Sequence, residues 1–241
     1  MSEGEGVLVS VRGEARRTVP PDSAVIAGTI AATRRSRAEA ARAAAAALDN
    51  LTADLAALGG VALGAETLRR PLTWSAHSAA TRQEHAHDKR TGQSEPTGQV
   101  TGTVEVRIEV RDFGLLGRLD SHLSTHEAFI VHAVSWHVDW DNPGWHDVRA
   151  AAIEAAISKG HDYAAALGGQ LITVEHIADP GLIGAGDGQH WVSSSGRSAR
   201  MLTGGGGDAG SAPSLDPVPQ ELTALIEARF RAGGISLTRE A

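Results

Sequence analysis

The segment from Val100 to Arg111 constrains the fold most, because apolar and polar residues alternate along it almost without a break. One side of this segment is apolar and consists of Val104, Val106, Ile108 and Val110. The other side is polar and consists of Thr103, Glu105, Arg107, Glu109 and Arg111. Successive side chains of an extended chain point to opposite faces, so this pattern predicts a strand in a sheet with one covered face.

Further strands are predicted on both sides of this segment. Apolar residues recur through Val7–Arg17 and Ala24–Thr33, and the two runs are separated by Val19-Pro20-Pro21-Asp22. Two prolines remove two amide donors, so the sequence predicts strand, turn and strand here. Residues 129–140 and 171–177 are also predicted to be strands, and residues 61–74 form a weaker extended segment.

Two long stretches are rich in alanine and predict amphipathic helices, at 36–58 and 145–167. In the first, larger apolar residues recur at spacings of three and four, and Gly59-Gly60 follows as a stop signal. Ser36 and Glu39 fit a capping box at its start. A short third helix is predicted after Asp112, a typical N-cap residue.

Three segments are harder to interpret. Residues 76–98 are polar and rich in histidine, which predicts a long mobile loop or a hairpin tip. Residues 180–218 are rich in glycine and serine and bury too little apolar area to offset their backbone entropy, so a second mobile insertion is expected. The spacing of apolar residues at 221–231 is compatible with either a helix or a strand, and this spacing alone favours a helix.

Composition excludes several classes of function. The 241 residues contain 29 acidic and 22 basic side chains, which gives a net charge of −7 and disfavours nucleic-acid binding. The basic run Arg34-Arg35-Ser36-Arg37 could contact phosphate, but its position at the start of a helix indicates a solvated surface. The chain has no cysteine, so disulfides, thiolate nucleophiles and cysteine metal sites are ruled out.

Membrane insertion and export are not predicted. No run reaches the roughly 18 apolar residues that a membrane-spanning helix requires. The first residues include Glu3 and Glu5 where an export signal would carry basic residues. A cytoplasmic location is therefore expected.

Histidines supply the candidates for a metal site. His85 and His87 lie in the sequence Glu84-His85-Ala86-His87-Asp88 and could share a metal, although ordering a mobile loop costs entropy. His122 and His126 lie one helical turn apart, but the glutamate that zinc hydrolases place directly after the first histidine is absent. His132 shares a predicted strand face with Trp136 and is expected to be buried and hydrogen-bonded.

Signatures of catalysis are weak. No G-x-S-x-G nucleophile motif occurs, and Ser193, Ser194 and Ser195 lie in low-complexity sequence. The glycines at 184–188 precede His190-Trp191-Val192 rather than a helix that could bind phosphate. We therefore expect no catalytic residues, no cofactor and no committed metal site.

Tryptophans are the candidates for an interface. Large aromatic side chains are favoured both in protein cores and at subunit contacts. Trp136 is expected in the core. Trp140 is the last residue of the strand predicted at 129–140, Trp145 follows shortly after it, and both are our interface candidates.

The order of these parts resembles the SIMPL-domain family, formerly a domain of unknown function. The resemblance covers about residues 7–230. In the first half it rests on Val11-Arg12-Gly13-Glu14, Pro21-Asp22, Thr97-Gly98-Gln99-Val100 and Arg111-Asp112-Phe113. In the second half it rests on Val134-Ser135-Trp136, residues 150–156 and Ala166-Leu167-Gly168-Gly169-Gln170-Leu171.

The resemblance implies an α+β fold with an antiparallel or mixed sheet and with two long Ala-rich helices and one short helix packed on one side. It implies one domain over residues 6–232, a closing strand in place of a helix at the tail, and self-assembly into rings or larger oligomers. It assigns no catalytic residue.

Two functions remain open at this point. The first is a non-enzymatic scaffold or interaction protein that assembles with itself. The second is a metal-binding or small-molecule-binding protein that uses the His-rich loop.

Overall fold

The computed structural model describes residues 6–87, 93–182 and 215–235, and these divide into two compact units. Of the described residues, the terminal unit contains 6–19, 140–182 and 219–235. The central unit contains 20–87, 93–139 and 215–218. The single domain predicted over residues 6–232 therefore consists, in its described part, of two units, each with its own sheet.

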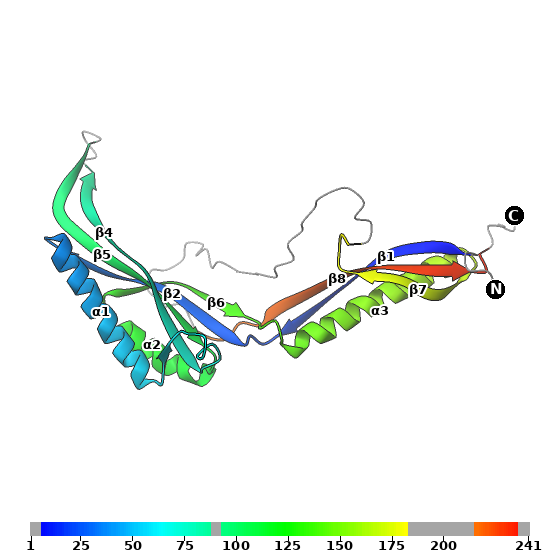
Figure 1. Ribbon diagram of the computed structural model, residues 1–241, viewed down its shortest axis with the longest axis horizontal. Coiled ribbons are helices and arrows are strands. Elements are labelled where there is room, and N and C mark those ends of the chain that lie inside the picture. The colour runs from blue at the N-terminus through cyan, green and yellow to red at the C-terminus, as the bar shows by residue number, and fades with distance from the viewer. Residues whose placement is uncertain (1–5, 88–92, 183–214, 236–241) are drawn as a thin grey trace. The chain divides into compact units, whose positions relative to one another are not determined.

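The terminal unit is a three-stranded antiparallel sheet with one helix (Figure 1). Strand β8 (Gln220–Gly233) lies between β1 (Val7–Val19) and β7 (Gln170–Ala178). Helix α3 (Pro143–Ala166) begins at the N-cap Asn142, whose side chain accepts a hydrogen bond from the Gly144 amide. The residues that α3 buries are mostly small: Gly144, Val148, Ala152, Ala156, Gly160 and Ala164.

The central unit is a five-stranded mixed sheet in the order β3-β4-β5-β2-β6. Its strands are β2 (Ser23–Arg34), β3 (Val61–Ala62), β4 (Leu72–His87), β5 (Ser94–Val110) and β6 (Phe129–His137). Only β3 and β4 pair in parallel. The helices are α1 (Arg37–Ala57) and α2 (Leu116–Thr125), and the short 3₁₀ helix η1 (Phe113–Leu115) precedes α2. The predicted α+β class with antiparallel and mixed sheets is confirmed.

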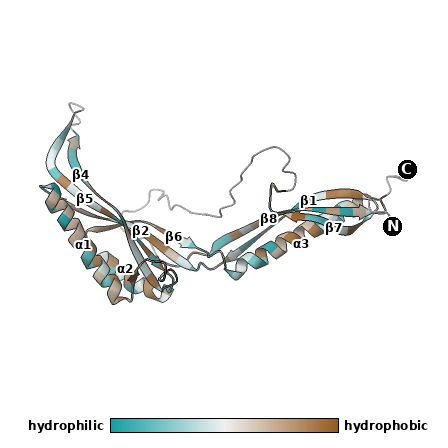
Figure 2. Ribbon diagram, in the orientation of Figure 1, coloured by the Kyte–Doolittle hydropathy of each residue, from teal (hydrophilic) through white to brown (hydrophobic). Residues whose placement is uncertain are grey.

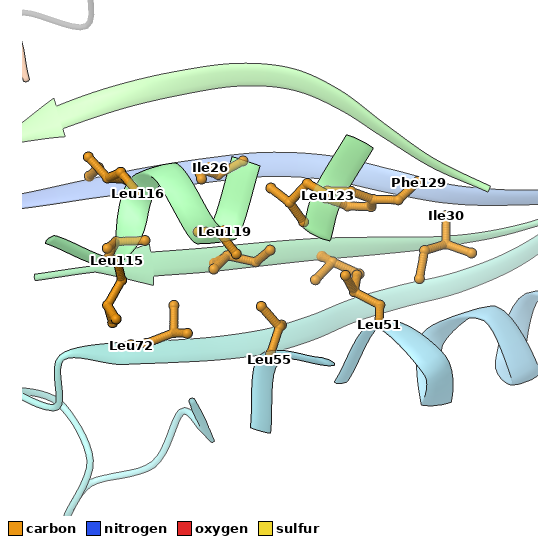
Figure 3. Packing of buried hydrophobic residues seen from close by; sticks show 14 of the residues in the cluster. Ile26, Ile30, Leu51, Leu55, Leu72, Leu115, Leu116, Leu119, Leu123 and Phe129 are labelled. Carbon is orange, nitrogen blue, oxygen red and sulfur yellow. The ribbon is translucent and has the colours of Figure 1, made fainter. Parts of the chain in front are cut away.

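The core of the central unit lies between its sheet and the helices α1 and α2 (Figure 3). Leu51 and Leu55 of α1 and Leu119 of α2 are each at most 1% exposed. They meet the apolar face of the sheet, where Ile26 and Ile30 of β2 are equally buried. Burial of each such side chain contributes about 1.5–3 kcal/mol, so this cluster supplies much of the stability of the unit.

Helices come unusually close to strands in both units because glycine occupies the contact points. In the central unit, a Cβ atom added to Gly102 of β5 would lie 2.6 Å from the carbonyl oxygen of Ala40 in α1. In the terminal unit, a Cβ atom added to Gly13 of β1 would collide with the Ala152 carbonyl of α3. An alanine on the helix and a glycine on the strand thus bring two backbones into direct contact.

The tail forms strand β8, as the family resemblance implies and against the helical pattern. Its apolar residues at even positions are buried from Leu222 to Ala232, while β1 and β7 satisfy its backbone on both sides. Pairing with distant strands therefore decides a segment whose local pattern is ambiguous.

Of the two alternatives predicted for residues 76–98, the mobile loop is wrong over most of its length and the hairpin agrees with the described residues. Residues 76–87 belong to β4 and residues 94–98 to β5, which pair as an antiparallel hairpin. The period of two was hidden because the register shifts at His77/Ala79 and again at Gln83/His85. Toward the tip both strands are coloured largely hydrophilic in Figure 2, so no apolar face marks them as strands. Most of the insertion expected at 180–218 lies outside the described residues.

The face assignment of β5 can be tested by one pair of variants. Val106 is 1% exposed, so Val106→Glu would bury an unpaired carboxylate and should lower the free energy of unfolding by about 4 kcal/mol or more. Arg107 on the same strand is exposed, and Arg107→Glu should cost about 1 kcal/mol or less. Denaturant unfolding followed by circular dichroism measures both, and equal costs would show that the faces are misassigned.

The close contact between α1 and β5 gives a second prediction. Gly102→Ala should destabilise the central unit by about 1–3 kcal/mol, because the added methyl group overpacks the contact with Ala40. Gly117→Ala in α2 is the matched control. An added Cβ there meets no atom within 4 Å, and alanine favours a helix by up to about 1 kcal/mol. Thermal unfolding should therefore shift in opposite directions, and a loss of stability in both variants would contradict this account.

Candidate functional site

Strand β7 carries three exposed large apolar side chains. Ile172, Val174 and Ile177 are 61%, 53% and 46% exposed. Val174 pairs with Phe230 and Ile177 pairs with Ala228, both buried residues of β8, so these two side chains lie on the sheet face that α3 covers. Because α3 lies mainly over β1 and β8, this apolar strip on β7 is left in contact with water.

One edge of the β7 backbone also has no strand partner among the described residues. Within the described residues β7 pairs only with β8, so its other edge presents amide and carbonyl groups without strand partners. The sheet also ends at β1, where Val7 and Leu8 are 45% and 46% exposed. Unpaired edges with apolar side chains are surfaces to which another strand can add.

A second apolar surface lies in the central unit. It is an open groove of about 500 Å³ between α1 and the β4–β5 hairpin, and its α1 wall consists of Ala41, Ala44, Ala45 and Leu48. The strand wall includes Ala76, Ala79 and Val104. In the described residues β3 pairs with only Thr73 and Trp74 of β4, so the β4 edge beside this groove is open over its remaining length.

The first pair of metal-site candidates, His85 and His87, is not joined by a third ligand among the described residues. His85 and His87 are exposed on β4, and the Nδ1 atom of His85 lies 3.1 Å from the Gln83 carbonyl oxygen. Asp88, which follows them in the sequence, lies outside the described residues. In the described ranges, no group of three His, Asp or Glu side chains is arranged to hold a metal ion.

His122 and His126 meet a carboxylate that sequence analysis did not find. The Nε2 atom of His126 lies 2.8 Å from the Oδ2 atom of Asp54, and the Nδ1 atom of His122 lies 3.7 Å from the same oxygen. Asp54 belongs to α1 and is 72 residues away from His126 in the sequence. This pairing joins α1 to the end of α2.

His132 corrects one expectation and satisfies another. It is exposed rather than buried, because the pairing of β6 with β2 shifts by one residue and His132 lies at the bulge. The predicted hydrogen bond exists, with Nε2 lying 2.7 Å from the Thr29 hydroxyl.

The tryptophans differ sharply in exposure. Trp136 is partly buried against the core and packs edge-on to Phe113, with ring centres 5.6 Å apart. Trp140, which follows the end of β6, is 83% exposed. Trp145 is half-buried, and the Arg149 guanidinium lies 5.6 Å from its ring centre. Of the two interface candidates, Trp140 is therefore the more accessible.

The strongest polar cluster is centred on Arg111 at the end of β5. Its guanidinium donates two hydrogen bonds to Asp139, at 2.7 and 3.2 Å, and lies 2.9 Å from Glu109. The hydrogen bond to Asp139 raises the pKa of Arg111 above its usual range, and the charge of Glu109 acts in the same direction. The Asp139 amide in turn donates to the Asp22 carboxylate. The cluster ties β5 to the segments beside β2 and β6.

Comparison with models of known protein families shows which family the chain belongs to. The family model described as SIMPL, a protein of unknown function (DUF541), matches residues 9–230. The chain belongs to the SIMPL family. The match spans both units and confirms the resemblance seen in the sequence. Among curated proteins, no match to the chain is found. Within the described residues, no helix is both long and apolar enough to cross a membrane.

The Arg111 cluster gives a prediction for stability. Arg111→Lys should lower the free energy of unfolding by about 1–2 kcal/mol, because an ammonium group cannot form the two-pronged contact with Asp139. Arg107→Lys on the exposed face of β5 is the control and should change the free energy of unfolding by about 0.5 kcal/mol or less.

The direction of the Arg111 pKa shift determines how the stability difference between the wild type and Arg111→Lys depends on pH. A pKa raised in the folded state adds stability at every pH below the ordinary arginine value, and this stability is lost only as the pH rises through the raised value. The gap between wild type and Arg111→Lys, measured by urea unfolding, should stay constant across the neutral range. A gap no larger than that of the control would show that the cluster is not stabilising.

Proposed function

We propose that this SIMPL-family protein is a non-enzymatic, cytoplasmic scaffold that assembles with copies of itself. The observation that carries the proposal is strand β7, which combines an open edge with the exposed side chains of Ile172, Val174 and Ile177. Contiguous apolar surface in water is costly, and its burial against another chain removes that cost.

The form of β7 indicates how copies would associate. The pairing of β7 with β8 shifts register between Leu171 and Thr173, and again between Val174 and His176. Such bulges interrupt a regular ladder and prevent long, indiscriminate strand addition. In our proposal the apolar side chains therefore supply most of the affinity, and the short regular stretches of backbone supply the orientation.

The central unit adds a second surface to the same proposal. The groove between α1 and β4 is lined with small apolar residues and adjoins an open strand edge. A chain that offers one apolar surface on each unit can contact two copies at once. That capacity is what extended or ring-shaped assemblies require, since contacts between unlike surfaces generate rings when they close.

Trp140 supports the proposal through its exposure of 83%. A tryptophan contributes a large apolar area at little entropic cost, and such residues often dominate binding energy at interfaces. Trp145 contributes less in this proposal, because it is already packed beneath Arg149.

The polar clusters support a structural rather than a catalytic role. Arg111 is paired with Asp139 and Glu109, and Asp54 is paired with His126. In each case the polar groups contact one another and connect neighbouring elements, so the proposal assigns them to stability.

The test removes the apolar strip while keeping the fold. Val174→Asp combined with Ile177→Asp places two charges on exposed positions of β7, so the domain should remain folded. The mass measured by light scattering should fall from that of an oligomer to that of a monomer, or the assembly should require at least about tenfold more protein. Elemental analysis of the same wild-type sample should find no stoichiometric metal.

Thr173→Asp combined with His176→Asp is the matched control. It adds the same charge to the same strand, at positions that pair with Arg231 and Arg229 of β8. This control should keep the oligomeric mass. A wild-type protein that is monomeric, or that loses assembly equally in both double variants, would reject the proposal, and a metal-loaded monomer would favour a metal-binding protein instead.

A further inference from the structure

Three arginines of the central unit gather around one open pocket. The pocket has a volume of about 770 Å³ and is lined by Thr33, Arg34, Arg35, Glu39, Arg42, Ala43 and Gln99. Arg34 is the last residue of β2 and pairs with Val100, which places Gln99 of β5 beside it. Arg35 follows in the turn, and Arg42 lies on α1. The fold therefore converts the basic run near residue 35 into a concave site and adds Arg42 and Gln99 from elsewhere in the chain.

The described residues compensate the positive charge of this pocket only in part. Three guanidinium groups face a single carboxylate, that of Glu39. Among the residues that the structure describes, no carboxylate forms an ion pair with Arg34, Arg35 or Arg42. The chain as a whole carries a net charge of −7, so the local positive charge of this pocket is opposite in sign to the overall charge.

The arginines also retain free hydrogen-bond donors. Arg34 donates through Nη1 to the carbonyl oxygen of Thr33, and Arg42 donates through Nε to the carbonyl oxygen of Ala38. These contacts hold the two side chains in place and use only one of the five N–H groups that each guanidinium offers. The remaining donors and the side-chain amide of Gln99 are available to a ligand in the pocket.

We propose that this pocket binds a phosphate-bearing anion, either a soluble phosphate compound or the phosphate of a lipid headgroup. Guanidinium groups bind phosphate through pairs of parallel hydrogen bonds, which are stronger than bonds between neutral groups. Three arginines that approach from a strand end, a turn and a helix can contact several phosphate oxygens from different directions. The Thr33 hydroxyl, which lies 2.7 Å from that of Thr101, completes the polar wall.

Phosphate fits this site better than a carboxylate ligand does. A carboxylate has two oxygens in one plane and satisfies one guanidinium fork, whereas a terminal phosphate offers three oxygens and up to two negative charges. Two uncompensated positive charges match that charge. The openness of the pocket to solvent implies that binding weakens with added salt, because exposed charges are screened within about 8 Å at physiological ionic strength.

The test uses the full chain with sodium tripolyphosphate as the soluble probe in isothermal titration. The variant combines Arg35→Gln with Arg42→Gln, which should weaken binding at least about tenfold. The matched control combines Arg82→Gln with Arg118→Gln, two exposed arginines of the same unit that do not line the pocket. It removes the same charge and, because Arg82 pairs with Thr101 beside the pocket wall and can act on the anion through its charge, should weaken binding clearly less than the pocket variant does.

A second arm identifies the source of the phosphate. Vesicles that contain phosphatidic acid are sedimented with the protein, and vesicles of phosphatidylcholine alone serve as the blank. Saturable binding of either probe that depends on Arg35 and Arg42 supports the site, and the arm that binds tells whether the ligand is soluble or a lipid. Failure of both probes to bind, or equal weakening in the control, would overturn it. The oligomeric mass of the pocket variant should remain that of the wild type, so the result is independent of the self-assembly proposal.

Discussion

The structure depends on the direct approach of alanine-rich helices to glycine-bearing strands. An alanine side chain buries little area, so a helix made largely of alanine gains little from burial at ordinary distances. Gly102 beneath Ala40, and Gly13 beneath Ala152, remove the Cβ atoms that would hold the backbones apart. The closer approach increases dispersion contacts along the whole interface, which offsets the small size of the side chains. Both units use this solution with different helices and different sheets.

The same solution explains where apolar surface remains. A close-packed helix covers only the strands directly beneath it, and α3 lies mainly over β1 and β8. The neighbouring strand β7 is left with apolar side chains that α3 does not reach. In the central unit α1 leaves the groove beside β4 partly open for a similar reason. The exposed surfaces on which the proposed self-assembly rests are thus a consequence of how the cores are built.

Much of the fold could be predicted from the sequence. Alternation in β5, the capping residue Ser36 of α1 and the prolines after β1 mark their elements, because each signal acts within a few residues. Strand β8 and the hairpin of β4 could not be read from local pattern, since distant pairing and register shifts determine them. The sites followed the same rule. Trp140 could be proposed as an interface residue from its position at the end of a predicted strand, whereas the pairing of Asp54 with His126 and the placement of Arg35 and Arg42 around one pocket arise only when separate elements come together.

The connectivity of the two units has a consequence for biosynthesis. Residues 20–139 of the central unit lie between β1 and α3 of the terminal unit, and β8, the middle strand of the terminal sheet, follows all the other described strands in sequence. As the polypeptide leaves the ribosome, most of the central unit can fold while β1 still has no neighbour. The nascent terminal sheet therefore stays incomplete until β8 has been synthesised, and chaperones have a long opportunity to bind β1 and α3 before that point.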